Sequence, residues 1–379
     1  MKREFEIGPI RPPSEAESLL VRITRNCSWN RCKFCTLYKG QKFSTRSMEE
    51  IKEDIDMIAE YRANILEWVS EGGRSYDYIQ QKLYGLPDEM VQRYMYVLQW
   101  MNNGEESVFL QDANTAVLTF DKLKEILEYL RMKLPTAKRV TSYGRVESLA
   151  KFSVEQLIQL REAGLDRIHS GYESGSDKVL QLIDKGYTKA QEIEAGQKVK
   201  AAGIELSVYY MPGVGGKELS DDNAIETADV ISQVNPDFVR IRTFVSHFDT
   251  GLMEDINSGR MTECTDLEKM FEFKKMIENI HGADGMLYSD HIINLHQNVY
   301  GNLKTDKQKM LSIFEDFEKL SVQDQRRYQL ARRMGRVGQL SDMQYLGPEQ
   351  LNKIDEYLSK LETDEQFEAF ILRFLRQCI

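Results

Sequence analysis

Three of the five cysteines of this chain lie within nine positions of one another, in the segment NCSWNRCKFCTLY at residues 26–38. Cys27, Cys32 and Cys35 follow the spacing C-x4-C-x2-C. Thiolates at such short spacing can wrap one soft-metal centre, because a single loop presents all of them to the same point. In a chain without an export signal, the segment therefore predicts a metal site or redox chemistry and not structural disulfides.

Three thiols, and not four, limit the kind of centre. Structural zinc usually takes four protein ligands, and no histidine lies near this loop. The five histidines are all far downstream: His169, His247, His281, His291 and His296. A [4Fe–4S] cluster usually has four thiolates as well, so three would leave one iron open. S-adenosylmethionine (SAM) can chelate such an iron, and its reductive cleavage starts radical chemistry.

The elements that must position this loop are expected strands that alternate with amphipathic helices. Strands are expected at residues 18–24, 107–112, 139–143, 166–172, 204–211 and 237–244. Amphipathic helices with apolar residues at i, i+3, i+4 and i+7 are expected at 47–62, 120–134 and 153–165. Ser47, followed by Glu50, and Ser153, ahead of Glu155, are the predicted N-caps of two of these helices.

Strands that alternate with helices over six units require parallel pairing and right-handed crossovers. An open doubly wound sheet and a barrel both satisfy this requirement. The open sheet would carry a glycine-rich phosphate turn after its first strand, where this chain has the cysteine loop. Polar residues cluster after the strands, where a barrel forms its active face. We therefore predict an α/β fold, a partial (β/α)6 barrel with a mostly helical C-terminal extension.

Two regions do not fit the repeat. Residues 63–106 form an expected helical insert that is rich in Tyr, Trp and Met. We expect an N-terminal segment over 1–16, the barrel over 17–262 and the helical extension over 263–379. The extension could cover one end of the barrel or form a homodimer.

Composition excludes several classes of protein. Fifty basic against sixty acidic residues give a net charge of −10, which argues against nucleic acid as the main partner. The basic run at 326–336 is more typical of a solvated helix face. No run of 18 apolar residues and no signal peptide is present, so no membrane span and a cytoplasmic location with reduced cysteines are expected.

The cysteine loop resembles that of the radical SAM superfamily, in which an aromatic residue, here Phe34, precedes the last cysteine. The usual spacing there is C-x3-C-x2-C, so this loop has one extra residue. Segments 108–118, 139–188 and 202–216 also resemble radical SAM domains and occur in the same order. The likeness covers roughly residues 17–245 and is greatest to the elongator-like and coproporphyrinogen-oxidase-like branches. The tail resembles a branch of unknown reaction.

The resemblance implies an enzyme that uses one [4Fe–4S] cluster to cleave SAM reductively. The product, a 5′-deoxyadenosyl radical, would abstract hydrogen from a small or medium-sized substrate. Cys27, Cys32 and Cys35 would ligate the cluster, and an electron donor such as flavodoxin or ferredoxin would reduce it in an anaerobic oxidoreductase. Cys264 and Cys378 are too few to hold a second cluster.

The resemblance also implies SAM-binding groups at the strand ends. Asp112 lies where the family has a Gly-Gly-Glu segment that receives the ammonium, and a helix cap is its structural alternative. Arg145 offers a forked pair of donors for a carboxylate. Glu173 suits a hydroxyl pair or the ammonium, with a structural salt bridge as the alternative. The expected cofactor contacts are Phe34, Asp112, Asn114, Ser142, Arg145, Glu173, Ser207, Arg240 and Met211.

The last two strands carry the expected catalytic residues. Alternation puts Val239 and Ile241 on one strand face and Arg240 and Arg242 on the other. If the arginines enter the barrel, one could bind the SAM carboxylate and the other a substrate anion, and a buried ion pair is the alternative. Tyr209 lies on the polar face of the preceding strand, and we assign catalytic roles to Tyr209 and Arg242.

A second class of function uses the same fold without turnover. A haem- or cluster-handling protein would bind haem and yield no 5′-deoxyadenosine from SAM, which discriminates it from the enzyme. His169 and the other histidines are weak candidates for haem ligands. The residues His247, Asp249, Asp290 and His291 are further polar candidates for contact with the substrate.

Overall fold

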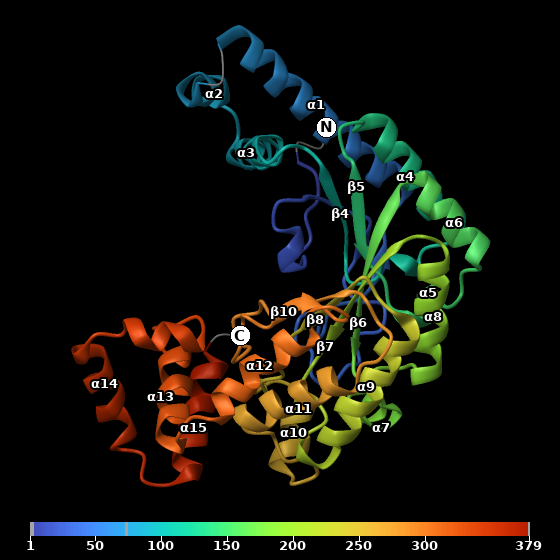
Figure 1. Cartoon of the computed structure of the whole chain (residues 1–379). Helices are drawn as coiled ribbons and strands as arrows, with labels where there is room; N and C mark the ends of the chain where they lie inside the picture. The colour runs from blue at the N-terminus through green and yellow to red at the C-terminus, as the bar shows by residue number, and fades with distance from the viewer. Residues whose placement is uncertain (1–3, 73–74, 378–379) are drawn as a thin grey trace. The chain divides into compact units, whose positions relative to one another are not determined.

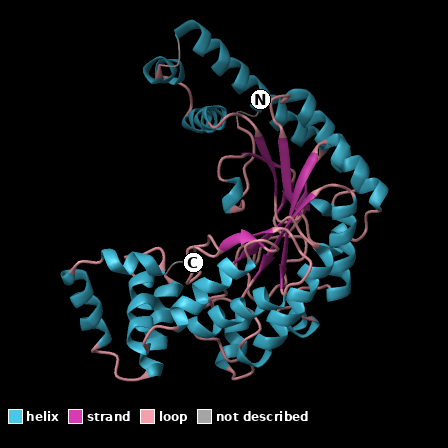
Figure 2. Cartoon of the chain, in the orientation of Figure 1, coloured by secondary structure: helices cyan, strands magenta, loops and turns pink. Residues whose placement is uncertain are grey.

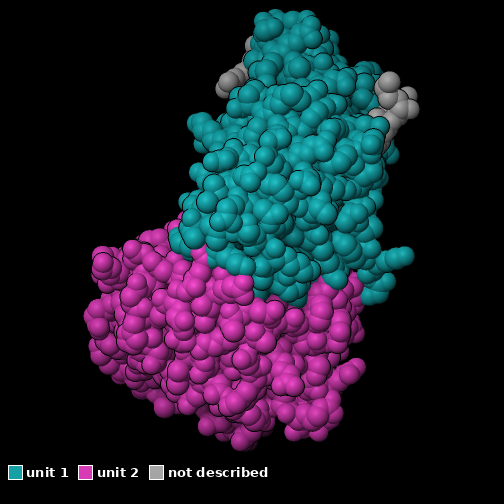
Figure 3. Space-filling view, turned by 90° about the vertical axis from the view of Figure 1, so that its right-hand side faces the viewer, with its two compact units in different colours: residues 1–28, 40–169, 198–205 teal, residues 29–39, 170–197, 206–379 magenta. Residues whose placement is uncertain are grey.

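The computed structural model describes residues 4–72 and 75–377, so Cys378 lies outside the described residues. The chain separates into two compact units, coloured in Figure 3. Unit 1 comprises residues 1–28, 40–169 and 198–205. Unit 2 comprises residues 29–39, 170–197 and 206–379. Within the described ranges, no helix is both long enough and apolar enough to span a membrane.

The six predicted strands are all present, with ends that differ by a few residues from those expected. The strands are β1 (Leu19–Arg22), β2 (Thr24–Arg25), β3 (Ser44–Thr45), β4 (Ser107–Gln111), β5 (Arg139–Tyr143), β6 (Leu165–Glu173), β7 (Glu205–Tyr210), β8 (Phe238–Ile241), β9 (Met286–Tyr288) and β10 (Tyr300–Asn302). The sheet has the order β1-β4-β5-β6-β7-β8-β9-β10, and β2 pairs with β3 separately. β9 and β10 pair in antiparallel orientation, whereas the pairs β1–β4, β4–β5, β5–β6, β7–β8 and β8–β9 are parallel. The predicted α/β fold of partial-barrel type is confirmed.

Helices follow most strands and make up the C-terminal part of the chain, as Figures 1 and 2 show. The α-helices are α1 (Met48–Gly72), α2 (Tyr76–Leu83), α3 (Asp88–Asn102), α4 (Phe120–Lys133), α5 (Val146–Leu149), α6 (Val154–Ala163), α7 (Asp177–Leu182), α8 (Lys189–Ala201), α9 (Ser220–Val234), α10 (Gly251–Asn257), α11 (Asp266–Asn279), α12 (Lys307–Glu318), α13 (Val322–Arg333), α14 (Pro348–Leu358) and α15 (Asp364–Arg376). The 3-10 helices are η1 (Pro13–Glu15), η2 (Thr115–Val117), η3 (Lys217–Leu219) and η4 (Leu340–Tyr345).

Local sequence explains where several helices begin and end. Ser47 and Glu50 form the predicted reciprocal cap, with the Glu50 N–H 3.1 Å from Ser47 Oγ and the Ser47 N–H 2.8 Å from Glu50 Oε2. Ser153 caps α6 as predicted, but its reciprocal partner is Gln156 and not Glu155. The third helical position is the one whose side chain can reach back to the cap. Gly164 ends α6 with a φ of 116°, a conformation that favours glycine.

The sheet in unit 1 has one face covered by helices and one inner face. Register places Leu110, Ser142 and Ile168 on the same side, and Ser142 and Ile168 line a small space together with residues of α4 and α6. Figure 1 shows α4 and α6 beside the strands of unit 1. The inner face carries Phe109, Thr141, Tyr143 and His169. The N-terminal segment packs against this inner face, because Glu15 in η1 is hydrogen-bonded to His169 Nε2 at 3.2 Å. His169 is therefore engaged within the fold.

The strands in unit 2 show the same division. Val208 and Tyr210 on β7 share a side with Val239 and Ile241 on β8, and all four are buried. Tyr210 marks this as the helix-covered side, since its hydroxyl donates to Glu272 of α11 at 2.8 Å. The opposite side, the inner face of unit 2, carries Ser207, Tyr209, Arg240 and Tyr288. The period-two alternation predicted for β7 and β8 is thus observed within the strands.

The C-terminal helices enclose a buried histidine. The ring of His296 stacks on Tyr328 of α13 with centroids 5.4 Å apart, and it meets Phe314 and Phe317 of α12 edge-on. Burial, aided by the charges of Arg333 and Arg332, lowers the pKa of His296 to about 3. The folded chain therefore holds a neutral imidazole at this position.

We expect His296 to make the fold sensitive to acid. Below pH 6.5 the unfolded chain binds a proton at His296, whereas the folded chain does not until about pH 3. The free energy of unfolding is therefore highest above pH 6.5 and falls by about 2 kcal/mol between pH 7 and pH 5. Urea unfolding of a His296→Phe variant should show a shallower loss over this range. A slope equal to that of the unmodified chain would contradict this, and His281→Phe at an exposed position is the control.

Candidate active site

The cysteine loop leaves the sheet directly after its first strand. It begins and ends at a short antiparallel ladder, in which Thr24 pairs with Thr45 and Arg25 with Ser44. Cys32 is buried, and its carbonyl accepts the N–H of Cys35 at 3.3 Å. Within residues 4–72 and 75–377, no three histidine, cysteine or acidic side chains are gathered as a metal site. The assignment of the three cysteines as ligands therefore stays a prediction.

Asp112 anchors the start of this loop in unit 1. Its Oδ2 atom accepts the N–H of Asn26 at 3.1 Å and Nη2 of Arg22 at 2.7 Å. Its own N–H donates to Thr24 Oγ1 at 3.1 Å. Asp112 is completely buried and is engaged by the chain itself. Arg22 supplies a positive partner within the fold, and the predicted contact of Asp112 with the SAM ammonium stays a prediction.

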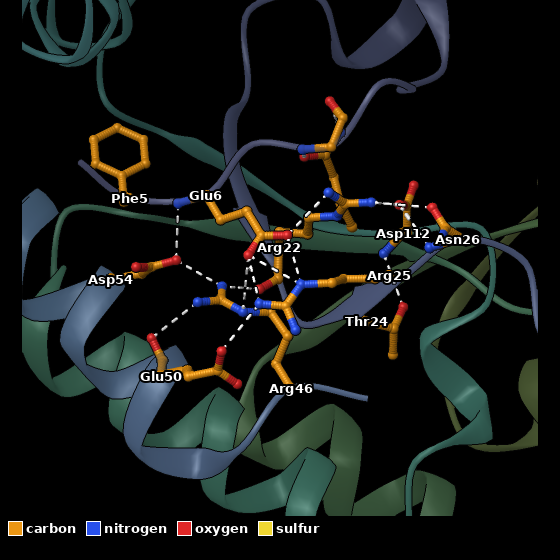
Figure 4. A network of polar contacts seen from close by, with 12 residues as sticks. Phe5, Glu6, Arg22, Thr24, Arg25, Asn26, Arg46, Glu50, Asp54 and Asp112 are labelled. Carbon is orange, nitrogen blue, oxygen red and sulfur yellow. Dashed lines mark hydrogen bonds and ion pairs between the residues drawn. The ribbon is translucent and has the colours of Figure 1, made fainter. Parts of the chain in front are cut away.

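The contacts of Asp112 continue into a larger ionic network, drawn in Figure 4. Arg22 Nη1 lies 2.9 Å from Glu6, and Arg46 Nη1 lies 2.6 Å from Asp54 of α1. The Glu6 N–H also donates to Asp54 Oδ2 at 2.9 Å. Burial would raise the pKa of Glu6, but Arg25, Arg46 and Arg22 together lower it below its usual value. The network thus joins helix α1 to the first residue of the cysteine loop.

Asn114 holds a second point of the same loop. Its Nδ2 donates to Ser28 Oγ at 3.0 Å and to Ser148 Oγ at 2.9 Å, and its Oδ1 accepts the N–H of Arg145 at 3.0 Å. The guanidinium of Arg145 pairs with Glu147. These contacts make Asn114 a positioning residue that joins the loop to the turn after β5. A direct role of Asn114 or Arg145 in binding SAM stays a prediction.

Ser142 does not lie on the inner face. It shares the helix-covered side of β5, and its hydroxyl contacts Thr115 Oγ1. Leu149 and Phe152 line the same small space. Because side chains alternate along a strand, the inner-face positions of β5 are Thr141 and Tyr143. Ser142 thus lies on the helix-covered side of β5, and its predicted contact with SAM stays a prediction.

The second half of the loop belongs to unit 2 and is held there by Trp29, which was not among the predicted site residues. Trp29 Nε1 donates to the carbonyl of Asp184 at 2.7 Å. The guanidinium of Arg31 lies 4.8 Å from the centre of the Trp29 ring and pairs with Asp184 at 3.2 Å. Gly186, at a φ of +85°, packs so closely on the ring that a Cβ atom there would overlap it. The extra residue of the C-x4-C spacing thus belongs to a segment with its own docking contacts.

Lys33, which lies between the second and third cysteines, also holds this segment in place. Its N–H donates to the carbonyl of Ile183 at 2.9 Å, and its carbonyl accepts the N–H of Leu252 at 3.2 Å. Its Nζ atom lies 2.8 Å from Asp255. Backbone contacts of this kind do not depend on side-chain identity, which is why no sequence pattern indicated them.

We expect the contact of Trp29 with Gly186 to control retention of the cluster. Trp29→Ala and Gly186→Ala should each speed iron loss from the reconstituted protein to a chelator at least tenfold, because both loosen the docked loop. Trp29→Phe, which keeps an aromatic ring but loses the indole N–H and part of the ring contact, should lie between them and the unmodified chain. Trp68→Phe in α1 is the control. Equal rates of iron loss in all four variants would refute a positioning role.

Glu173 forms a buried ion pair near Phe34 in unit 2. Lys185 Nζ lies 3.0 Å from Glu173 Oε1 and 5.3 Å from the centre of the Phe34 ring. The structural alternative considered for Glu173 is therefore observed. Lys185 was missed because it lies between two helices, in a turn whose direction the sequence does not show. The pair places charge beside the loop aromatic, and a contact of Glu173 with SAM stays a prediction.

Met211 contributes to the core under the loop. Its side chain is buried together with Ile183, Val214 and Phe244, and Phe34 packs against this cluster. Its N–H donates to the carbonyl of Glu173 at 2.9 Å. Met211 and Phe34 thus share one apolar contact region under the loop. Their contacts with SAM stay predictions.

Three predicted residues leave polar atoms unused on the inner face of unit 2. Within the part of the chain that the structure describes, Ser207 Oγ, Tyr209 Oη and Arg240 Nε are buried without a hydrogen-bond partner. Burial raises the pKa of Tyr209, although the charges of Arg240 and Arg242 oppose this rise, so Tyr209 is a neutral phenol. Buried polar atoms of this kind are rare, since each costs about 1–3 kcal/mol when unpaired.

Arg242 differs from Arg240. Arg242 follows the last residue of β8, Ile241, and is exposed, and its predicted catalytic role stays a prediction. Its N–H donates to the carbonyl of Tyr210 at 2.9 Å. Burial lowers the pKa of His291 to about 4, and the positive charge of Arg242 adds to this lowering.

The groups present fit the two cofactors expected from the sequence. Three thiols in one loop are the soft donors that iron–sulfur clusters use. The unpartnered hydroxyls and guanidinium nitrogen of the inner face match the polar groups of a ligand such as SAM.

Comparison with known proteins adds an independent finding. The model of the radical SAM superfamily matches residues 21–230. The chain is 25% identical over 265 residues to the 4′-phospho-dehydrooxetanocin synthase of Priestia megaterium, covering 69% of this chain and 30% of that protein. It is 23% identical over 266 residues to the tRNA-2-methylthio-N(6)-dimethylallyladenosine synthase of Syntrophus aciditrophicus (strain SB), covering 70% and 49%. The chain thus spans about a third to a half of the length of these relatives.

Solved structures show a more distant likeness. The Elp3 protein of the archaeon Methanocaldococcus infernus aligns with a TM-score of 0.43 and 16% identity, covering 60% of this chain and 58% of that chain.

Proposed function

Because this chain belongs to the radical SAM superfamily, whose enzymes use a [4Fe–4S] cluster and SAM, we propose that Cys27, Cys32 and Cys35 hold the cluster. The proposed activity is reductive cleavage of SAM, followed by hydrogen abstraction from a small or medium-sized substrate. The bound cluster would supply the electron for this cleavage. The observation that carries the proposal is the set of three thiols in one loop after β1, without a fourth ligand in the loop.

The residues around the loop would hold it in place while the open iron site is used. Asp112 and Asn114 fix its first residues, and Trp29 and Lys33 fix its middle. Phe34 would pack near the adenine of SAM, with the ammonium of Lys185 over its ring. These contacts restrict the loop before any cofactor binds, which lowers the entropy lost on binding.

The inner face of unit 2 would bind the polar groups of SAM and substrate. Arg240 offers a guanidinium to a carboxylate, and the Ser207 hydroxyl can donate or accept. Tyr209, neutral because its burial raises the pKa, can donate a hydrogen bond without carrying charge. Arg242, exposed beyond the end of β8, would meet the substrate from the solvent side.

The deciding experiment is a SAM-cleavage assay. The purified chain is reconstituted anaerobically with iron and sulfide, reduced with dithionite and supplied with SAM, and 5′-deoxyadenosine is measured. We expect 5′-deoxyadenosine to form only when the reconstituted cluster, dithionite and SAM are all present. Tight haem binding without 5′-deoxyadenosine would favour the haem- or cluster-handling alternative.

Several finer expectations belong to the same proposal. A flavodoxin or ferredoxin would be the physiological electron donor, and the helices after residue 263 would form a homodimer. The cytoplasmic location expected from the sequence is also part of this proposal. Reduction of the cluster by a purified flavodoxin and measurement of the molecular mass in solution would test the first two.

A further inference from the structure

A cavity of about 550 Å³ lies in unit 2. Its walls come from the segment between β9 and β10, from the end of α13 and the turn after it, from η4 and Leu346, and from α14. The lining residues used below are Asp290, Ile292, Gln297, Arg336, Asp342 and Tyr345. A cavity of this volume is in the range that holds a small organic molecule.

The cavity wall carries two guanidinium groups, those of Arg332 and Arg336, and two carboxylates, those of Asp290 and Asp342. Arg336 is exposed, and no ion pair of its guanidinium is found within the described ranges. The two acidic residues of the wall are already engaged. Asp342 accepts the N–H groups of Gly338 and Gln339 at 2.9 and 3.0 Å, and Asp290 pairs with Arg240 at 3.4 Å. An anionic group would therefore find its partner at Arg336.

The same walls expose apolar surface. Ile292 is 59% exposed and Tyr345 is 78% exposed, although both are large hydrophobic side chains. Gln297 is held in place by a hydrogen bond of its Nε2 to the carbonyl of Asp290 at 3.0 Å. An apolar surface beside a fixed amide and a guanidinium favours a ligand with an apolar part and an anionic group.

Asp290 connects this cavity to the inner face of unit 2. It lines the cavity and pairs with Arg240, whose guanidinium also lies 5.2 Å from the centre of the Tyr288 ring. Arg240 shares its strand face with Ser207 and Tyr209, which carry the unpartnered hydroxyls. A molecule in the cavity that extends past Asp290 would thus approach the residues proposed for the reaction.

We propose that this cavity binds the substrate of the radical reaction through a carboxylate or phosphate held by Arg336. The apolar part of the substrate packs against Ile292 and Tyr345, and its other end extends past Asp290 toward Arg240. Arginine suits both anions because its planar guanidinium donates two parallel hydrogen bonds. This inference rests on the proposed function for the identity of the ligand as substrate.

Binding of model compounds to the full-length chain tests the proposal without cluster or SAM. Phenyl phosphate and phenylacetate are the anionic probes, 2-phenylethylamine is the cationic probe, and affinity is measured by calorimetry. We expect at least one anion to bind and the amine to bind at least tenfold more weakly. The stronger of the two anions identifies the group that Arg336 selects.

Substitutions locate the binding site. Arg336→Glu should lower the affinity for the anion at least tenfold, and Tyr345→Ala should lower it several-fold. Arg373→Glu, at an exposed position of α15, should leave this affinity unchanged. Arg336→Gln replaces the first variant if circular dichroism shows that it is misfolded. Failure of both anions to bind, stronger binding of the amine, or equal anion affinity in the Arg336 and Arg373 variants would overturn the proposal. Since no cluster is involved, these outcomes are independent of the SAM-cleavage assay.

Discussion

Replacing any one of Cys27, Cys32 and Cys35 by alanine is expected to abolish formation of 5′-deoxyadenosine from SAM. The loop offers no fourth thiol that could substitute, and an iron that loses its protein ligand is exposed to solvent and to chelators. We expect each variant to retain much less iron after reconstitution and desalting than the unmodified chain. Iron and sulfide analysis, together with the absorbance and EPR spectra of the reduced cluster, measures this directly.

Cys264 provides the matched control. It is buried at 3% exposure in unit 2, and burial raises its pKa to about 12, which makes it a poor ligand. Cys264→Ala should keep the full iron content and the full rate of SAM cleavage. Full activity in any variant of the loop cysteines, or loss of the cluster in Cys264→Ala alone, would refute the assignment of ligands.

Removing the carboxylate of Asp54 is expected to destabilise the chain by about 3–5 kcal/mol. Arg46 is completely buried, and Asp54 at 2.6 Å is its closest charged partner, so Asp54→Ala leaves a buried guanidinium without adequate compensation. The more distant contact with Glu6, at 3.6 Å, replaces only part of the pair. Urea denaturation followed by circular dichroism gives the free energy of unfolding.

The neighbouring Asp56 separates this effect from a general effect of charge in α1. Asp56 is half-exposed and pairs with Lys133 at 2.6 Å, so Asp56→Ala should cost at most about 1 kcal/mol. Asp54→Ala should also lower iron retention, because the same network reaches Asn26 at the start of the cysteine loop (Figure 4). Equal free energies of unfolding for the two variants would contradict the role of the buried pair.

The sequence by itself determined the features that depend on local spacing. The C-x4-C-x2-C loop, the alternation of strands and helices and the cap at Ser47 are properties of adjacent residues, and the structure shows each of them in place. The alternation along β7 and β8 also placed Tyr209 and Arg240 on one face, because the side-chain period of a strand is two. Strand β8 ends at Ile241, so the inner-face position predicted for Arg242 stays a prediction.

Only the tertiary structure decided which polar residues are engaged within the fold. Asp112 meets Arg22, 90 positions away, and Glu173 meets Lys185, which lies beyond helix α7. Such partners come from different elements, so periodicity cannot reveal them. Ser207, Tyr209 and Arg240 instead keep buried polar atoms without partners among the described residues. The physical reason for the difference is long-range packing, which gives some buried polar groups a partner within the fold and gives others none among the described residues.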